Sequence, residues 1–395
     1  MTDVPPPIPG AVPPPPLPEA AAPQSPQAPP APAPQGVSSV CPSCGDQLAY
    51  VPGTMLLKCA TCGTEVPIKA VEATITEHSL DDWEAKNPTT FVANVAAHEL
   101  RCQNCGATTE TTNLASKCQF CGGALVATDR PEGLVAPEGV IPFQVQNKQA
   151  HEAFGKWVTS RWFAPNALKK VGSTEGLTGT YIPHWTYDSH TETDYTGQRG
   201  DYYYTTETRQ VSDGQGGTRT ETYQQRHTAW RHASGHVARD FDDVLVLGSH
   251  ALDPKKVNKM GPWRLADAKP FQDEFLTGFA AVRYDLDPQA GSEQAKQHMV
   301  SVIEGDVRSD IGGDEQRISA MNVGYSGNTF KLLLMPLWIA TYVFAGKTWQ
   351  VMVNANTGEV VGDRPYSPWK ITFATLLALV VVAAIIVAVV LSRRH

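Results

Sequence analysis

Apolar and polar positions between residues 131 and 366 follow the spacings of both helices and strands. One helical segment, residues 148–163, repeats apolar side chains every three to four positions, at Ala150, Phe154, Trp157, Val158 and Trp162. A second helix is predicted to begin at Asp287 and Pro288, since proline suits the first helical turn, and to show an apolar face made of Ala295, Met299, Val302 and Ile303. These two helices form the α part of the predicted domain.

Strand-like runs fill much of the rest of this region. Two polar runs, 201–211 and 218–232, flank the glycine-rich turn Asp213–Gly217 and predict a protruding hairpin. Other strands are predicted at Tyr181–Tyr187, at Phe241–Leu247, and from Thr329 to Val361 with breaks at Gly346 and at Asn354–Gly358. Residues 131–366 therefore predict an α+β domain, in which helices pack on an antiparallel sheet.

The hydrophobic pattern changes near the C-terminus. Residues 371–391 are apolar except for Thr372 and Thr375, and they carry no charge. A helix of this length spans about 30 Å of hydrocarbon, whereas a buried helix of a water-soluble protein rarely stays apolar on every side. We therefore expect residues 367–392 to form a single transmembrane helix.

The N-terminal segment has the opposite character. Residues 1–36 hold 15 of the 31 prolines and no aromatic residue, which predicts a disordered, proline-rich arm. The arm lacks the basic start and apolar core of a signal peptide. It is interpreted as a solvated spacer, with a proline-motif docking site as the alternative.

Eight cysteines occur, all in four Cys-x-x-Cys-Gly pairs. Fourteen residues separate the first two pairs and twelve separate the last two. The pairs form an internal repeat that predicts two tandem ribbons, residues 37–70 and 99–130, joined by a connector at 71–98 in which Ser79 caps a helix. The predicted metal ligands are Cys41, Cys44, Cys59, Cys62, Cys102, Cys105, Cys118 and Cys121.

Each group of four thiolates suits a tetrahedral structural zinc ion, so two zinc ions per chain are expected. Such a site is filled by its ligands and leaves no position for a reacting water. A disulfide framework is the less favoured alternative, because such frameworks belong to small secreted chains. Four-sulfur iron remains open, since thiolates also suit iron.

Bulk charge and cysteine use bear on location and partners. The net charge of −8 and the pI near 5.8 argue against a general phosphate-binding surface. Lysine and arginine counts on the two sides of the apolar span do not decide its orientation. Reduced thiolates imply a reducing compartment, so we expect a single-pass, tail-anchored protein of the cell membrane with the bulk of the chain in the cytoplasm.

Motifs for catalysis are incomplete. Ala345–Thr348 ends like a phosphate-binding loop, but position 341 holds threonine where that loop needs glycine, so a hairpin turn and no bound nucleotide are expected. Asp314–Arg317 resembles an acidic metal-binding box but follows no apolar strand, and is interpreted as a charged loop. No helicase or ATPase motif is complete and no catalytic residue is assigned.

Histidine and tryptophan are the two residue types that could form a ligand-binding site. His227, His232 and His236 lie close together in the sequence, with His184 and His190 upstream, and three imidazoles could bind a catalytic metal. No His-Glu-x-x-His pair or partnering carboxylate pattern accompanies them, and polar strands often carry histidine, so a metal site is not favoured. Tryptophans that could stack on a ligand are instead expected to fill the core, at Trp157, Trp162, Trp185, Trp230, Trp263 and Trp338.

Several sequence blocks accompany the cysteine pairs: Ile141–Phe143, Arg161–Pro165, Tyr181–Tyr187, Phe241–Val246, Asp310–Ile318 and Val353–Ser367. With these blocks the chain resembles bacterial membrane-anchored proteins with TFIIB-type zinc ribbons, often labelled as like primosomal protein N′ (replication factor Y), a superfamily II helicase. The resemblance covers nearly everything from Cys41 to Trp369. It implies the ribbon architecture and all eight metal ligands, and it supplies no catalytic residue.

Three functions are then considered. The first is a non-catalytic zinc-binding adaptor or scaffold at the cytosolic face of the membrane, which binds protein partners. The second is a zinc-ribbon protein that binds nucleic acid. Basic residues near the cysteine pairs would contact the phosphates, but they supply little positive charge: Lys58, Lys69, Arg101 and Lys117. The third is an enzyme with an unrecognised site in residues 131–366. The adaptor is the leading hypothesis.

Overall fold

The structure is a computed structural model. It describes residues 40–86, 98–102, 107–111, 118, 120, 125–128, 135–161, 176–212, 216–344, 347–363 and 367–392. Some predictions fall outside these residues, namely those for the N-terminal arm, Lys117, Cys105, Cys121 and Trp162, and most of the block Arg161–Pro165.

The first cysteine ribbon, which was predicted to be a small β structure, forms an antiparallel sheet of three strands. Its strands are β1 (Leu48–Tyr50), β2 (Leu56–Cys59) and β3 (Glu65–Pro67). Side chains of β1 alternate between buried and exposed, which matches the two-residue period of a strand with one covered face. The ribbon therefore has an inner face that must pack on another part of the chain.

A second, larger sheet contains the other strands. Its main path runs in the order β11, β8, β13, β9, β12, β6, β5, β7, and β10 pairs with β9. The bounds of its strands are β4 (His78–Ser79), β5 (His98–Cys102), β6 (Thr108–Thr111), β7 (Leu125–Thr128), β8 (Gly139–Val140), β9 (Thr178–Ser212), β10 (Thr218–Leu247), β11 (Lys269–Pro270), β12 (Ala280–Val282), β13 (Glu315–Phe344), β14 (Lys347–Asn354) and β15 (Val360–Gly362).

This sheet is mixed, which corrects the prediction of an antiparallel sheet. β12 runs parallel to β9, and β8 runs parallel to β13, while the other described pairings are antiparallel. Parallel pairing needs a long connection between the two strands. Such a connection is present, because the chain leaves β9 at Ser212 and returns beside it as β12 only after β10 and the segment 248–279.

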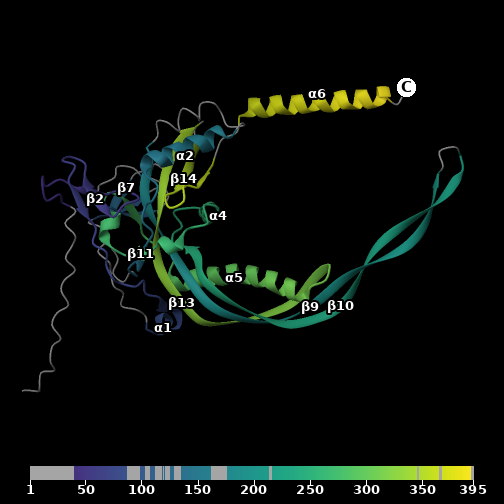
Figure 1. The fold of residues 1–395 in the computed structure, drawn as a ribbon, viewed down its shortest axis with the longest axis horizontal. Coiled ribbons are helices and arrows are strands. Elements are labelled where there is room, and N and C mark those ends of the chain that lie inside the picture. Colours follow the sequence, from purple (N-terminus) through teal and green to yellow (C-terminus); the bar gives the residue numbers. More distant parts are fainter. Residues whose placement is uncertain are drawn as a thin grey trace, which may run out of the picture. The chain divides into compact units, whose positions relative to one another are not determined.

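Three very long strands dominate the sheet, and Figure 1 shows β9 and β10 continuing past the end of β13. The hairpin predicted at residues 201–232 is confirmed, and it merges with the neighbouring predicted strands into two uninterrupted ones. The sequence did not predict such long strands, because threonine and serine occupy many of their buried positions and weaken the alternation of apolar and polar residues. Thr191 and Thr193 are buried while His190 and Glu192 are exposed.

The helix α5 (Pro288–Ile311) packs on these long strands. It begins where predicted: the Asp287 carboxylate accepts a hydrogen bond from the Ala290 N–H at 2.9 Å. Three of its four predicted apolar residues are buried, at Ala295, Met299 and Ile303. The fourth prediction was wrong, because Val302 is 43% exposed and lies off the buried stripe.

The remaining helices cover other parts of the sheet or extend from it. Ser79 accepts a hydrogen bond from the Asp82 N–H at 3.2 Å and caps α1, as predicted. Ala150, Phe154 and Val158 of α2 are buried. The bounds of these helices are α1 (Leu80–Lys86), α2 (Asn147–Thr159), α4 (Pro254–Asn258), the 3-10 turns η1 (Leu265–Asp267) and η2 (Asp273–Leu276), and α6 (Pro368–Ser392).

Two motif interpretations can be compared with the backbone. Lys347 and Thr348 open β14, which pairs antiparallel with the end of β13, so the predicted hairpin is confirmed there. The predicted charged loop at Asp314–Arg317 was wrong for its last three residues, which begin β13. The charges of these residues favoured a loop over a strand in the sequence. This end of β13 lies on an exposed part of the sheet, where a strand tolerates charge.

Candidate metal centre

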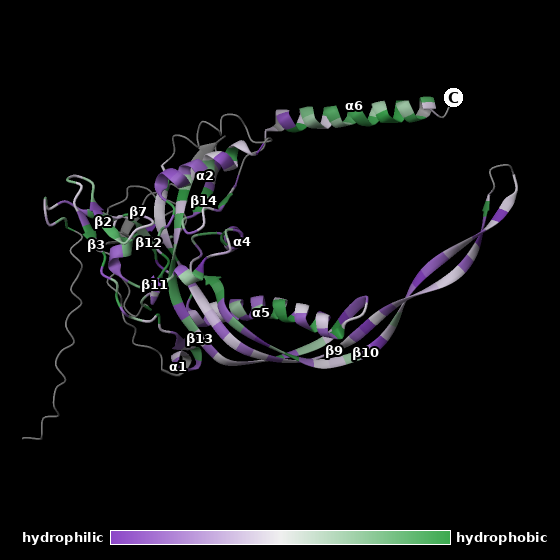
Figure 2. Cartoon of the chain, viewed as in Figure 1, coloured by the Kyte–Doolittle hydropathy of each residue, from purple (hydrophilic) through white to green (hydrophobic). Residues whose placement is uncertain are grey.

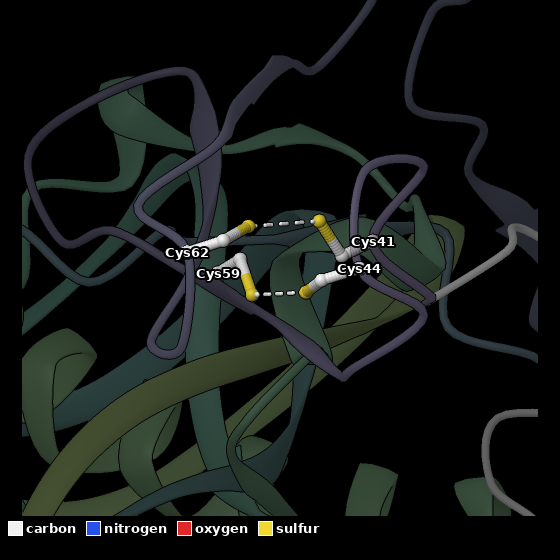
Figure 3. Close-up of side chains that lie close together, drawn as sticks. All are labelled: Cys41, Cys44, Cys59 and Cys62. Carbon is white, nitrogen blue, oxygen red and sulfur yellow. Dashed lines mark hydrogen bonds between the residues drawn. The ribbon is translucent and has the colours of Figure 1, made fainter.

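The four cysteines of the first ribbon meet at one point. Their sulfur atoms all lie within 4.8 Å of one another. The Sγ atoms of Cys41 and Cys62 are 3.5 Å apart, as are those of Cys44 and Cys59. Figure 3 shows the four side chains directed toward one another from two loops. This arrangement confirms that the first four predicted ligands form one group.

The two cysteine pairs sit on two backbone turns of the same kind. The glycine after the second cysteine donates its N–H to the carbonyl of the first, from Gly45 to Cys41 and from Gly63 to Cys59, both at 3.0 Å. Both glycines have φ of 76°, a left-handed value that other residues adopt at a cost. The sequence Cys-x-x-Cys-Gly therefore folds locally into a loop that presents two sulfurs on one side.

Hydroxyl groups connect the two loops beside the sulfurs. The Thr64 hydroxyl lies 3.1 Å from the Cys62 sulfur and 3.0 Å from the Ser43 hydroxyl. Hydrogen bonds from Thr64 to the sulfur lower the pKa of Cys62 to about 6. A lowered pKa favours the thiolate of Cys62, which is the form that binds a metal.

Burial differs across the centre. Cys41 and Cys59 are 2% and 1% exposed, whereas Cys44 and Cys62 are exposed. Four sulfurs at this spacing fit the donor set of a tetrahedral zinc or iron ion, with all positions filled by protein. With zinc bound, such a group would be structural, because no position is left for a substrate or water.

The second ribbon repeats part of this design within the described residues. Cys102 and Cys118 are 2% and 3% exposed and belong to one apolar cluster with Phe120. The Cys102 N–H donates to the Ala107 carbonyl at 2.8 Å, and the Cys41 N–H donates to the Asp46 carbonyl, also five residues later, at 2.6 Å. The second metal site, which also needs Cys105 and Cys121, stays a prediction.

Neither ribbon is an independent module, which the sequence did not reveal. Tyr50 of the first ribbon is 3% exposed, and its ring packs edge-on against Phe275 with centroids 5.4 Å apart. Its hydroxyl donates to the Thr54 carbonyl at 2.9 Å, and its N–H donates to the Thr277 carbonyl at 2.9 Å. The first metal centre is thus fixed to the core of the large domain.

The second ribbon joins the large sheet through its backbone. β6 pairs with β12, and β12 in turn pairs with β9. The segment 273–283 therefore contacts both ribbons, the first at Phe275 and Thr277 and the second at Ala281 and Val282. One short segment links the two cysteine ribbons to the central strand of the domain.

The histidines do not gather into a site in the described part of the chain. His184 is buried, and burial lowers its pKa to about 4. His190 pairs with Asp240 at 2.5 Å, and His236 pairs with Asp194 at 2.9 Å, across the exposed face of β9 and β10. Because each pair stands alone on the strands, these residues serve as cross-strand contacts.

A second group of potential ligands is the carboxylates of Asp188, Asp242 and Asp243, whose oxygens lie within 4.8 Å. Lys331, only 8% exposed, places its Nζ 2.7 Å from Asp243 and 2.8 Å from Glu77. Burial alone would lower the pKa of Lys331, but the hydrogen bonds that its ammonium group donates to these carboxylates raise the pKa above its ordinary value. The lysine supplies the positive charge here, so the group is an ion-pair network.

The tryptophans fall into two groups in the described residues. Trp185 and Trp338 are 0% and 5% exposed and lie in the core, as expected. Trp230 is half-buried on the β10 strand, with the Arg317 guanidinium 3.8 Å from its ring centroid. The core interpretation is therefore confirmed for the first two, while Trp230 lies at the surface.

The C-terminal helix α6 is long and apolar enough to cross a membrane. Its span Trp369–Val389 covers 21 residues with a mean hydropathy of 2.9, and none of that span is buried. Figure 2 shows apolar residues along the helix. Length and composition agree with the predicted transmembrane segment, and an unburied helix of this kind differs from the core helix of a water-soluble protein.

Comparison with known proteins adds one relative. The chain is 28% identical over 341 residues to the uncharacterized protein YdjG of Bacillus subtilis (strain 168), and the alignment covers 85% of this chain and 92% of that protein. No family model and no solved structure matches the chain. The similarity extends over most of both proteins, and the name of the relative states no activity.

Proposed function

We propose that this protein is a zinc-stabilised scaffold that is anchored by α6 at the cytosolic face of the cell membrane and binds protein partners there. The observation that carries the proposal is the closed group of four sulfurs fixed to the domain core through Tyr50. A metal bound there serves to hold surfaces in place rather than to react.

The membrane part rests on the exposed, apolar surface of α6. Burial of a span with mean hydropathy 2.9 in lipid removes this surface from water, which strongly favours insertion. The cytosolic placement rests on the thiolates, since metal binding needs cysteines that stay reduced. Large domains with such centres belong on the reducing side of the membrane.

Protein partners are favoured over nucleic acid by the charge pattern of the described surface. Several exposed arginines of the long strands are paired with carboxylates, among them Arg209 with Glu221 and Arg239 with Asp306. A phosphate backbone would have to displace these carboxylates, and counterion release from arginines that are already neutralised contributes little. The nucleic-acid alternative predicts steeply salt-dependent DNA binding by the full chain.

The test combines three measurements on the full chain expressed in bacterial cells. We expect membrane fractions to contain the protein, the purified chain to carry two zinc ions, and solubilised membranes to yield reproducible protein partners. A variant with Val381→Arg and Val382→Arg places two charges within the span, at about 2.5–3.5 kcal/mol each, and should move to the soluble fraction. The control Val381→Leu and Val382→Leu should stay in the membrane.

Each result has a distinct meaning. A wild-type chain found entirely in the soluble fraction would reject the anchor, and a chain without bound metal would reject the zinc centre. DNA binding that is lost with rising salt, in the absence of protein partners, would replace the scaffold with the nucleic-acid hypothesis.

A further inference from the structure

The outer edge of β10 lacks two of the features that commonly keep strand edges from pairing. One edge of β10 bonds to β9, and no strand within the described residues pairs with the other. The register is unbroken from Thr218 to Phe241, and the first bulge comes after it, before Val244. This stretch contains neither proline nor lysine, the residues that commonly protect exposed edges.

The backbone groups that face outward along this edge can be assigned. The Gly200 carbonyl accepts from the Asp314 N–H at 2.8 Å, and the Tyr202 N–H donates to the Asp314 carboxylate at 2.7 Å. Even-numbered residues of β9 therefore turn their backbone groups toward β13, and odd-numbered ones turn toward β10. Because odd residues pair with odd residues, such as Tyr195 with Gly235, even residues of β10 direct N–H and C=O outward.

The side chains of these even residues all lie on the face opposite α5. Odd positions face the helix: the Asp310 carboxylate lies against Gly235, and Arg239 bonds to Asp306 at 2.6 Å. The even positions from 226 to 240 are exposed or half-buried, and they are Arg226, Thr228, Trp230, His232, Ser234, His236, Ala238 and Asp240. One cation stands at one end of this row and one anion at the other.

This row is complementary to itself in one antiparallel register. With a two-fold axis at Ala233, Arg226 of one copy faces Asp240 of the other, and Trp230 faces His236. Registers whose axis lies two residues away oppose like charges: an axis at Gly235 sets Arg231 against Arg239, and an axis at Arg231 sets that residue against itself. Axes at His232 and Ser234 oppose no like charges, but they set Asp240 against Gln224 or Thr228, so that its charge meets no opposite charge. Cross-strand pairs of opposite charge stabilise a sheet, and like charges directly opposite destabilise it.

The helix on β10 leaves room for the second copy. α5 contacts β10 at Gly235 and Arg239. In the Ala233 register these residues stand opposite Arg231 and His227 of the other copy. These two contacts place the two copies of α5 over different halves of the ladder.

We propose that two copies of this chain associate through β10, in antiparallel register about Ala233, to form one continuous sheet. A second copy is the occupant that the charge pattern selects, since by symmetry each end of the row meets the opposite charge of the other copy, in addition to the contacts of Asp240 with His190 and of Arg226 with the Tyr202 ring within its own chain. The N-terminal arm is a poor alternative, because its 15 prolines in 36 residues lack the N–H groups that a ladder needs. The proposal holds whether or not the metal and membrane parts of the proposed function are right.

Charge exchange tests the register. The molecular mass of the full chain in detergent micelles is measured by light scattering and ultracentrifugation, with the detergent contribution subtracted. Arg226→Asp and Asp240→Arg each create two like-charge pairs, so each variant alone should dimerise about tenfold more weakly or worse. An equimolar mixture of the two, and the variant carrying both changes, should recover the dimer because opposite charges again face each other.

A proline tests the ladder itself. Ser234→Pro removes an outward N–H and leaves the bonds to β9 intact, so the dimer should weaken about tenfold or more while the thermal unfolding of the chain stays unchanged. The matched control Ser234→Ala keeps the N–H and should dimerise like the wild type.

Three results would overturn the proposal. A wild-type chain that stays monomeric at its highest soluble concentration excludes the second copy. A dimer that persists in both single charge variants forms through another surface, such as α6. Protection of β10 amides from hydrogen exchange that appears only when another protein is added identifies a foreign strand as the occupant of the edge.

Discussion

The first cysteine ribbon and the far end of the β9–β10 hairpin are both β structures without a core of their own, and they are stabilised in opposite ways. The ribbon has strands of three or four residues, a group of four thiols, and one buried tyrosine against the domain. The hairpin beyond Gly200 pairs two strands over residues 201–212 and 218–229, without β13 beside it. The ribbon depends on a few interactions at one site, whereas the hairpin depends on many weak contacts along its two strands.

Cross-strand contacts of the hairpin illustrate the second strategy. Tyr203 stacks on His227 with centroids 5.3 Å apart, and Arg209 pairs with Glu221 at 2.9 Å. Each contact of this kind contributes about 0.2–1 kcal/mol, so the loss of any one is tolerated. The ribbon would have no such reserve, since on the proposed function all four thiols bind one ion. Substitutions in the ribbon should therefore have large effects, and those in the hairpin small ones.

The largest effect is expected at a buried metal ligand. Cys59→Ser should release one of two zinc ions and unfold the first ribbon, at a cost of about 5 kcal/mol or more, because metal binding is the folding energy of such a site. Metal analysis and hydrogen exchange of residues 40–67 check this. Ser43→Ala, in the neighbouring loop but without a ligand atom, is the control and should keep both ions. An unchanged zinc content in Cys59→Ser would disprove the ligand assignment.

The connection between ribbon and domain comes next. Tyr50→Ala empties a site against Phe275 and should reduce the free energy of unfolding by about 3–5 kcal/mol. Tyr50→Phe loses only hydroxyl hydrogen bonds and should cost about 1 kcal/mol. Urea unfolding measures both. If Tyr50→Ala leaves the midpoint unchanged, the ribbon does not depend on this contact.

Acid should weaken the interior more than the hairpin. Burial lowers the pKa of His184 to about 4, below its ordinary value of 6.5, so the folded state favours the neutral ring. The stabilisation is fully present above pH 6.5 and is lost as the pH falls toward 4, which amounts to about 2 kcal/mol between pH 7 and pH 5. In urea titrations, the His184→Gln variant should lose about 2 kcal/mol less unfolding free energy between pH 7 and pH 5 than the wild type does. An identical loss in the variant and the wild type would contradict the prediction.

The smallest effect is expected on the hairpin. Arg209→Ala removes an exposed ion pair with Glu221 and a contact with the Tyr223 ring, and should change stability by about 0.5 kcal/mol or less. Hydrogen exchange should accelerate only near the substituted residue. A loss above about 1 kcal/mol would mean that this end of the hairpin packs on something further.

Features with local causes were predictable from sequence. The caps of α1 and α5 follow from Ser79 and Asp287, whose side chains bond to backbone within three residues. The hairpin of β9 and β10 follows from its glycine-rich turn. The first metal centre follows from Cys-x-x-Cys-Gly, since the turn that presents both sulfurs is contained in five residues.

Features that depend on distant pairing were not predictable. The attachment of Tyr50 to residues 275–277, and of β6 to β12, joins segments more than 150 residues apart. Val302 has helical spacing and is still exposed, because the position of the sheet decides which stripe of α5 is covered. Glu315–Arg317 forms a strand in spite of its charges, because β9 offers a partner edge there.

The sequence by itself determined the cysteine turns, the helix caps, the hairpin turn and the apolar character of α6, since each arises from neighbouring residues and the periods of helix and strand. Only the tertiary structure decided where the ribbons attach, how the long strands merge and which edge of β10 is left open. Backbone N–H and C=O groups are the same in every residue apart from proline, so their pairing over long distances is selected by the packing of the whole domain.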